Sequence, residues 1–316
     1  MKQTQQNDQL ESIAMQSKSK LTKTKILGNA LLLLAAIIWG LAFVAQRVGM
    51  DKIEPLTFNA ARTVLGAFAV GTVAAIMPKA PAKGVDPKLY KKDTIVGGVL
   101  CGIFLALASI LQQVGIVSTS AGKAGFITAM YMLLVPILNL VLFRKKSPYL
   151  VWFAVLVGLI GMYCLCITED FTLTKSDGLV AMCSIFFSFH IICADHFTKN
   201  GNPILISAIQ FVTAAVISIA AAFIIETPSW DKIASAAIPI LYCGLMSSGV
   251  GYTCQIAGQK YSEPATASIL LSLESVFAVL FGMLILHERM TMREVFGCIA
   301  MFAAVLLVQI TPHRKK

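Results

Sequence analysis

Two ionisable side chains inside long apolar runs are the first candidates for chemistry in this sequence. Arg62 lies in the apolar run 56–77, and Glu274 lies in the run 264–286. A charged side chain at the centre of a membrane helix costs about 2.5–3.5 kcal/mol on insertion scales, so each should face a cavity or a partner. Arg62 is either a cation that binds an anionic group, such as a carboxylate, or a structural clamp. Glu274 either carries a coupling proton or forms a structural ion pair with Arg62.

Aromatic and polar residues recur at helical spacing in two other runs. Trp39 is followed by Phe43 and Gln46 at intervals of four and three, which places them on one helical face. Tyr131 lies three residues after Thr128, in a run that also contains a proline. These faces predict an aromatic wall with polar ends.

The longest polar stripe runs through residues 234–260. Ser248, Tyr252, Gln255 and Gln259 follow one another at intervals of four, three and four. Such a stripe facing lipid would leave polar groups without partners. It is therefore expected to face the interior, where it either lines a path or joins helices.

Three further polar residues leave two interpretations open. Gln112 and Gln113 are adjacent, so their side chains diverge by roughly 100° on a helix. One should face a cavity and the other a neighbouring helix. His190 is a lone histidine in its run, and it is either a proton relay or a hydrogen-bonded packing residue.

Motifs of several enzyme classes are absent. The sequence contains no Gly-x-Ser-x-Gly, no His-Glu-x-x-His and no Walker A loop. The four histidines lack metal-ligand spacing, and all eight cysteines lie in apolar segments without a Cys-x-x-Cys pair. We therefore expect no catalytic residues, no metal site and no cofactor.

The elements that must position these side chains are membrane helices. The chain is 57% hydrophobic and only 13% charged, against about 25% charged in soluble domains. Apolar runs of about 20 residues match the hydrocarbon core, and only helices satisfy the backbone there without closing a barrel. The sequence predicts an all-α integral membrane fold of ten transmembrane helices, at 27–49, 56–77, 94–117, 121–143, 149–168, 177–198, 204–226, 234–260, 264–286 and 293–311.

The distribution of Lys and Arg predicts the orientation of these spans. The net charge of +10 comes from basic residues clustered in tails and loops, which argues against a nucleic-acid partner and for the lipid bilayer. The N-terminal tail, the loop 78–93, Arg144-Lys145-Lys146 and the C-terminal tail share one side. Both termini are therefore expected in the cytoplasm.

The second half of the sequence echoes the first. A shift of 148 positions pairs Pro55 with Pro203, and a shift of 143 pairs Gln112 with Gln255. Five helices per half invert the second copy in the membrane, and such inverted repeats bind substrates near the midplane. The expected organisation is a cytoplasmic polar tail at 1–25, a first repeat at 26–168 and a second repeat at 175–312.

Several strings in this order resemble the drug/metabolite transporter superfamily, and specifically its EamA-like family with two EamA repeats. The strings are Ala35-Ala36-Ile37-Ile38-Trp39-Gly40, Asn59-Ala60-Ala61-Arg62, 119–126 with Pro136, 272–278 and His287-Glu288-Arg289. Ser275 departs from the family, which commonly has proline there, and should soften the bend in the ninth span.

The resemblance implies a multi-pass carrier of the bacterial inner (plasma) membrane that exports small metabolites or drugs by alternating access. It implies a cavity lined by Trp39, Arg62, Gln113, Tyr131, His190 and Gln255.

The leading hypothesis is a secondary transporter, not an enzyme, that exports an amino acid or related carboxylate. A proton or a counter-substrate would couple to its movement. The alternatives are a multidrug exporter, in which Arg62 is structural, and a membrane factor that acts on lipid-linked substrates.

Overall fold

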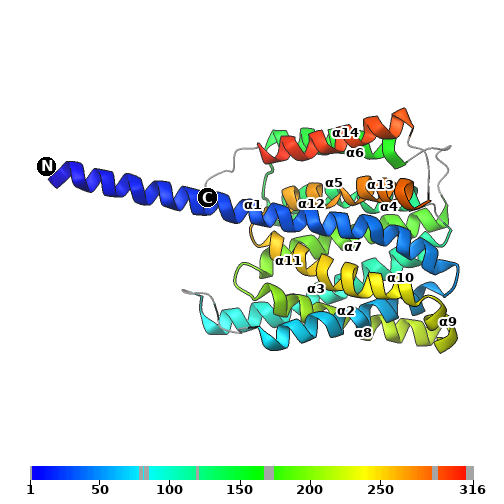
Figure 1. The fold of residues 1–316 in the computed structure, drawn as a ribbon. Coiled ribbons are helices and arrows are strands. Elements are labelled where there is room, and N and C mark those ends of the chain that lie inside the picture. Colours follow the sequence, from blue (N-terminus) through cyan, green and yellow to red (C-terminus); the bar gives the residue numbers. More distant parts are fainter. Residues whose placement is uncertain are drawn as a thin grey trace.

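The computed structural model describes residues 2–77, 81, 85–118, 121–166, 174–286 and 291–310, and its side chains from residue 24 except at 121–123, 165–166 and 286. All regular elements in these ranges are helices: α1 (Lys2–Met50), α2 (Pro55–Ile76), α3 (Pro87–Ile116), α4 (Ala121–Thr128), α5 (Tyr131–Phe143), α6 (Tyr149–Cys166), α7 (Lys175–Phe197), α8 (Pro203–Ile225), α9 (Trp230–Ser235), α10 (Ala237–Leu241), η1 (Tyr242–Gly251), α11 (Tyr252–Gln259), α12 (Pro264–Leu271), α13 (Glu274–Leu286) and α14 (Met292–Gln309). They form one bundle of nearly aligned helices, from which the N-terminal part of α1 projects (Figure 1).

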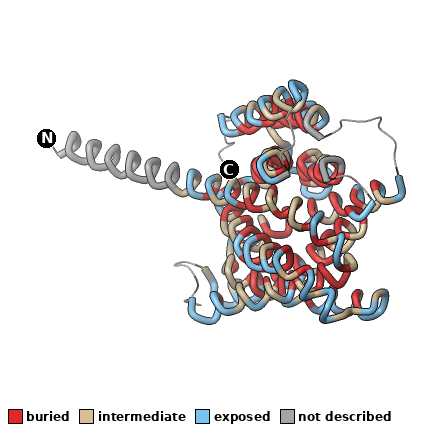
Figure 2. The backbone as a smooth tube through the Cα atoms, turned by 45° about the vertical axis from the view of Figure 1, so that its right-hand side comes forward, coloured by how far each residue is buried: buried red, intermediate tan, exposed pale blue. Residues whose placement is uncertain are grey.

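The helices have the length and hydropathy of membrane spans. Within the described residues, nine helices are long and apolar enough to cross a bilayer, and Tyr149–Cys164 is a shorter apolar helix at the position of the fifth predicted span. Buried residues fill the centre of the bundle, and exposed residues lie along its outside (Figure 2). Large apolar side chains such as Phe68, Phe153 and Phe223 are exposed there, as expected for a surface that meets lipid.

The tightest packing joins the two halves of the chain. From the first half, α3 packs on both α7 and α8, and α2 packs on α8. At the opposite side of the bundle α6 pairs with α14, and between these layers α1 packs along α13 (Figure 1). The core therefore lies where the halves meet, and a change in their relative position would repack it.

Two corresponding spans are interrupted at corresponding places. The fourth span divides into α4 and α5 at residues 129–130, and the ninth divides into α12 and α13 at residues 272–273. In the ninth span the amide of Ser275 donates to the carbonyl of Ser272 at 3.2 Å, a three-residue step, and the Ser275 hydroxyl donates to the same carbonyl at 2.8 Å. The turn between Ser272 and Ser275 is therefore tighter than an α-helical turn, although the ninth span has no proline at this position.

The close approach of α1 and α13 depends on a glycine in the first span. A Cβ built on Gly40 would lie 2.4 Å from the Cβ of Phe277 and 2.8 Å from the amide nitrogen of Ala278. Gly71 in α2, by contrast, has nothing within 4 Å of such a Cβ. Gly40 thus allows two helices of different halves to touch.

We predict that Gly40→Ala lowers thermal stability, because α1 and α13 must separate to admit the methyl group, at a cost of about 1–3 kcal/mol. Gly71→Ala is the matched control and should be neutral or stabilising by up to about 1 kcal/mol, since alanine favours the helix. Thermal unfolding of the purified protein measures both. Equal melting temperatures for the two variants would contradict the proposed contact.

Candidate binding cavity

A cavity lies among the helices of both halves. Its walls combine one cation, one carboxylate, neutral polar groups and aromatic rings. The lining residues are Trp39, Ala42, Phe43, Gln46, Arg62, Gln112, Thr128, Tyr131, Phe187, Ile191, Ser247, Tyr252, Gln255, Leu271 and Glu274. This mixture suits a small molecule with both charged and apolar parts.

The structure brings together most of the residues that the sequence singles out. Trp39, Arg62, Tyr131, Gln255 and Glu274 all line the cavity. They come from the first, second, fourth, eighth and ninth predicted spans, and so from both halves of the chain. Their proximity is a result of the tertiary packing.

Arg62 is held by a network that crosses the interface between the halves. Its side chain is buried, and its Nε donates to Oδ1 of Asn59 at 2.9 Å. The Nδ2 of Asn59 donates to the hydroxyls of Ser109 in α3, at 3.3 Å, and Ser218 in α8, at 3.0 Å. Asn59 is thus fixed by two other helices and in turn orients the guanidinium. Within the described part of the chain, Arg62 has no carboxylate partner.

We predict that Asn59→Ala weakens the proposed substrate binding by about 10-fold, because the guanidinium loses its only orienting hydrogen bond among the described residues. The control is Thr63→Val, since the Thr63 hydroxyl bonds only to carbonyls of its own helix. Dissociation constants measured on the folded variants test the difference. Asn59→Ala with native affinity would show that Arg62 needs no such support.

Glu274 contacts the other half of the chain through Tyr131. The Tyr131 hydroxyl donates to Oε1 of Glu274 at 3.1 Å, and both side chains are buried. Each is the first residue after an interruption, Tyr131 opening α5 and Glu274 opening α13. A second link runs from the hydroxyl of Ser272 to Sδ of Met132, at 3.4 Å. The two interrupted helices therefore meet at the cavity wall.

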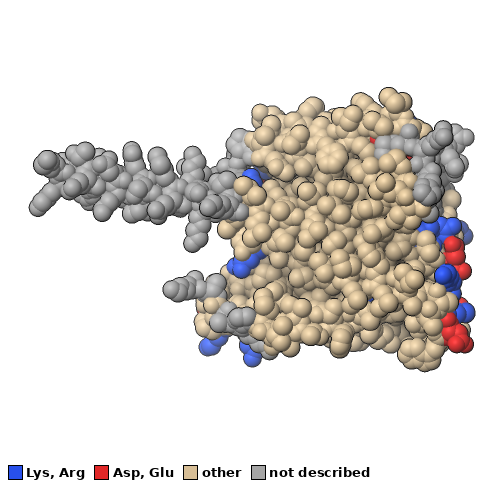
Figure 3. Space-filling view, in the orientation of Figure 1, with Lys and Arg blue, Asp and Glu red and all other residues tan. Residues whose placement is uncertain are grey.

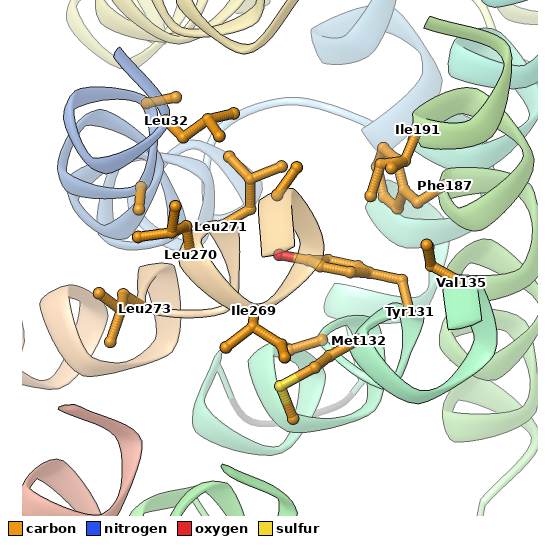
Figure 4. Close-up of a cluster of buried hydrophobic side chains, with 14 of the residues drawn as sticks. Leu32, Tyr131, Met132, Val135, Phe187, Ile191, Ile269, Leu270, Leu271 and Leu273 are labelled. Carbon is orange, nitrogen blue, oxygen red and sulfur yellow. The ribbon is translucent and has the colours of Figure 1, made fainter. Parts of the chain in front are cut away.

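Apolar side chains close the wall beside Tyr131. Figure 4 shows Leu270 and Leu271 of α12 and Phe187 and Ile191 of α7 around the Tyr131 ring. Phe187, Ile191 and Leu271 also line the cavity. An apolar part of a ligand would lie against this surface with little desolvation cost.

Trp39 and Tyr252 form the aromatic wall. Their ring centroids lie 4.6 Å apart, and the indole Nε1 of Trp39 donates to the carbonyl of Ser247 at 3.3 Å. Ser247 belongs to η1, a π-helix, and a Cβ on Gly251 would lie 2.6 Å from that indole nitrogen. The wider helix and its glycine thus make room for the tryptophan. π-Helical segments are frequent at functional sites.

The polar stripe of the eighth span divides between two roles. Tyr252 and Gln255 line the cavity, whereas Ser248 and Gln259 do not. The Nε2 of Gln259 donates to the carbonyl of Ile191 at 3.0 Å and so joins α11 to α7. Tyr252 is not among the binding residues predicted from the sequence. Its position in the polar stripe, three residues before Gln255, is the feature that could have identified it.

Gln113 and His190 lie outside the cavity wall. The Nε2 of Gln113 contacts Sδ of Met50 at 3.1 Å, while the neighbouring Gln112 lines the cavity and donates to the hydroxyl of Thr128 at 3.2 Å. His190 is fully buried, with its Nε2 2.9 Å from Oε1 of Gln210. Its ring also meets the edge of Tyr252, 5.8 Å between centroids, so it lies behind the aromatic wall.

Comparison with known proteins gives a consistent assignment. The family model described as the EamA-like transporter family matches residues 26–167 and 174–310. An uncharacterized transporter of Archaeoglobus fulgidus is 29% identical over 88% of this chain and 84% of its own length. The uncharacterized transporter YoaV of Bacillus subtilis is 25% identical over 89% of this chain and 96% of its own. A crystal structure with 16% identity superposes with a TM-score of 0.72 over 92% of this chain and 97% of the other, so the two share a fold. The chain belongs to the EamA-like transporter family.

Proposed function

We propose that the protein is a secondary active transporter that exports a small metabolite with a carboxylate group, such as an amino acid or related carboxylate. The observation that carries this proposal is Arg62, a buried cation on the cavity wall whose only bonded partner among the described residues is the neutral Asn59. A buried charge without a counter-ion is costly, and a substrate carboxylate would supply that counter-ion.

The other lining residues fit the rest of such a substrate. Trp39 and Tyr131 would pack on its apolar part, and Gln255 would form hydrogen bonds. Gln112 takes the role that the resemblance gave to Gln113, because it is the glutamine of this pair on the wall. Gln113 and His190 would support the wall from behind.

The architecture supports alternating access. Ten spans in two five-helix repeats would give the repeats opposite orientations, and rocking one against the other would open the cavity to each side in turn. The extensive packing between halves and the cavity at their interface suit such a movement. A proton or a counter-substrate would drive it.

The charges at the two ends support an orientation with both termini in the cytoplasm of a bacterial cell. Between the ends, the visible face carries almost no charge, and the charged side chains visible on it at the end nearer the N-terminus are basic (Figure 3). Asp86, Asp93 and Asp195 also lie at that end, where Asp195 pairs with Lys199. At the other end Arg47 pairs with Asp51 and Lys232 with Glu54. The hydrogen bond from Lys232 lowers the pKa of Glu54, so the Glu54 carboxylate stays ionised at neutral pH. An excess of Lys and Arg marks the cytoplasmic side.

Metabolite profiling of the culture medium tests the proposal. Cells that overproduce the protein should accumulate one or a few carboxylate-bearing metabolites outside, compared with cells that carry the empty vector. Purified protein in proteoliposomes should then show saturable transport and counterflow of the same compound. A medium unchanged in all such metabolites would count against export of this class.

A multidrug exporter is the second candidate, because the cavity wall holds five aromatic residues: Trp39, Phe43, Tyr131, Phe187 and Tyr252. Such a wall, with a carboxylate beside it, would also receive lipophilic cations. Competition by these cations for transport separates the two functions, since a site that selects carboxylates should be insensitive to them.

A further inference from the structure

The cavity is lined by one basic and one acidic side chain that do not pair with each other. Among its lining residues only Arg62 and Glu274 are charged. Glu274 accepts a hydrogen bond from Tyr131, and Arg62 donates one to Asn59. Within the described chain no ion pair joins the two, and none involves either of them. An unpaired basic side chain and an unpaired acidic side chain in one cavity each offer a site to a ligand group of opposite charge.

A neutral acceptor lies on the same wall. Gln46 is 4% exposed, and its Nε2 donates to the carbonyl of Ala42 at 3.2 Å. Because a carbonyl only accepts, the amide nitrogen must face it, and Oε1 of Gln46 is left buried without a partner among the described residues. A buried acceptor without a donor costs about 1–3 kcal/mol. A donor on a ligand would remove this cost.

The charges also belong to different halves of the chain. Arg62 is in α2, within the first matched repeat, and Glu274 opens α13, within the second. A ligand with one positive and one negative group would therefore bond to both halves at once. A ligand with a single charge would leave the other buried charge without a partner.

We propose that the cavity selects zwitterions of the amino-acid type, with the carboxylate on Arg62 and the ammonium on Glu274, assisted by the carbonyl oxygen of Gln46. This inference rests on the proposed function, which concerns the carboxylate alone. Glu274 is then a specificity-determining residue that binds the ammonium group. This role replaces the coupling role and the structural role considered for Glu274 from the sequence. Bound substrate links the two repeats, so it stabilises the conformations in which they approach and couples binding to their movement.

Matched ligands test each charge separately. The probes are the twenty proteinogenic L-amino acids, their N-acetyl derivatives, which lack the ammonium, and their amides, which lack the carboxylate. Their dissociation constants are measured on the full-length protein in lipid nanodiscs. At least one amino acid should bind, and its N-acetyl derivative and its amide should each bind about 10-fold or more weakly, as for a lost charged hydrogen bond.

Variants then assign the discrimination to Glu274. Glu274→Gln should bind the N-acetyl derivative as well as the free amino acid, whereas Glu274→Asp should recover at least part of the preference. Glu54→Gln removes a carboxylate that pairs with Lys232 outside the cavity, and it should keep native selectivity. Size-exclusion profiles and melting temperatures establish that the variants are folded.

The outcomes separate this inference from the proposed function. If N-acetyl derivatives bind the unmodified protein as tightly as free amino acids, Glu274 does not bind the ammonium group. The proposal of a carboxylate site at Arg62 is unaffected by this result. If Glu274→Gln keeps the preference for the free amino acid but loses coupled transport, the zwitterion assignment is equally overturned. If amides bind and no compound with a free carboxylate does, or if none of the probes binds, both proposals fail.

Discussion

Replacing Arg62 by glutamine is expected to abolish transport while leaving folded protein in the membrane. Glutamine keeps a hydrogen-bonding side chain but removes the positive charge, and hydrogen bonds to charged groups contribute about 1.5–3 kcal/mol. Affinity for a carboxylate ligand should therefore fall by about 10- to 150-fold, and export at cellular concentrations should be lost. Metabolite profiling of the medium at equal expression level measures the export, and binding in nanodiscs measures the affinity.

The control is Arg47→Gln, which makes the same chemical change at the end of α1. The Arg47 side chain is 50% exposed and pairs with Asp51 at 3.4 Å, outside the cavity. Exposed pairs of this kind contribute about 0–1 kcal/mol, so this variant should transport normally. Native transport by Arg62→Gln would show that the arginine is structural, and retained transport of lipophilic cations would favour the multidrug function.

The spans could be predicted because the hydrocarbon solvent imposes one requirement on every residue of a run. Apolar runs of sufficient length must be helices, and nine of them are found as such in the described residues. The interruptions before Tyr131 and Glu274, and the π-helix η1, were not predicted. Hydropathy is the same for a regular and an irregular helix, and the irregularities depend on packing between spans.

The candidate site was predictable to the extent that polar groups are costly in lipid. That cost placed Arg62 and Gln255 on interior faces, and both line the cavity. It could not choose between Gln112 and Gln113, because both avoid lipid and their faces differ only by the rotation of α3 about its axis. That rotation is set by the packing of α3 on α7 and α8, two helices far away in the sequence.

The interface between halves also explains which motif residues serve the site and which serve the fold. In the string that ends at Trp39 and Gly40, the tryptophan lines the cavity and the glycine allows α1 to touch α13. In the string that ends at Arg62, Asn59 orients the guanidinium and joins α2 to α3 and α8. Adjacent or nearly adjacent residues therefore build the site and the contact between repeats on which it depends. The string His287-Glu288-Arg289 lies outside the described residues.

The inverted arrangement of the repeats depends on whether α6 crosses the membrane, and cysteine labelling should give an all-or-none answer. Lys146 and Lys175 are exposed and lie on either side of α6 in the sequence, whereas Lys52 and Lys88 flank α2. If α6 crosses the membrane as the fifth of ten spans, a membrane-impermeant maleimide should label Lys175→Cys and Lys52→Cys in right-side-out vesicles. It should label Lys146→Cys and Lys88→Cys only in inside-out vesicles.

The background in this experiment should be low, because the described native cysteines are buried or partly buried in the bundle. The unmodified protein, labelled in parallel, corrects for it. Lys52→Cys and Lys88→Cys together test the orientation, and a reversed pattern would place the termini outside. Lys146→Cys and Lys175→Cys labelled from the same side would mean that α6 does not cross. The second repeat would then enter the membrane from the same side as the first, and alternating access through inverted repeats would lose its basis.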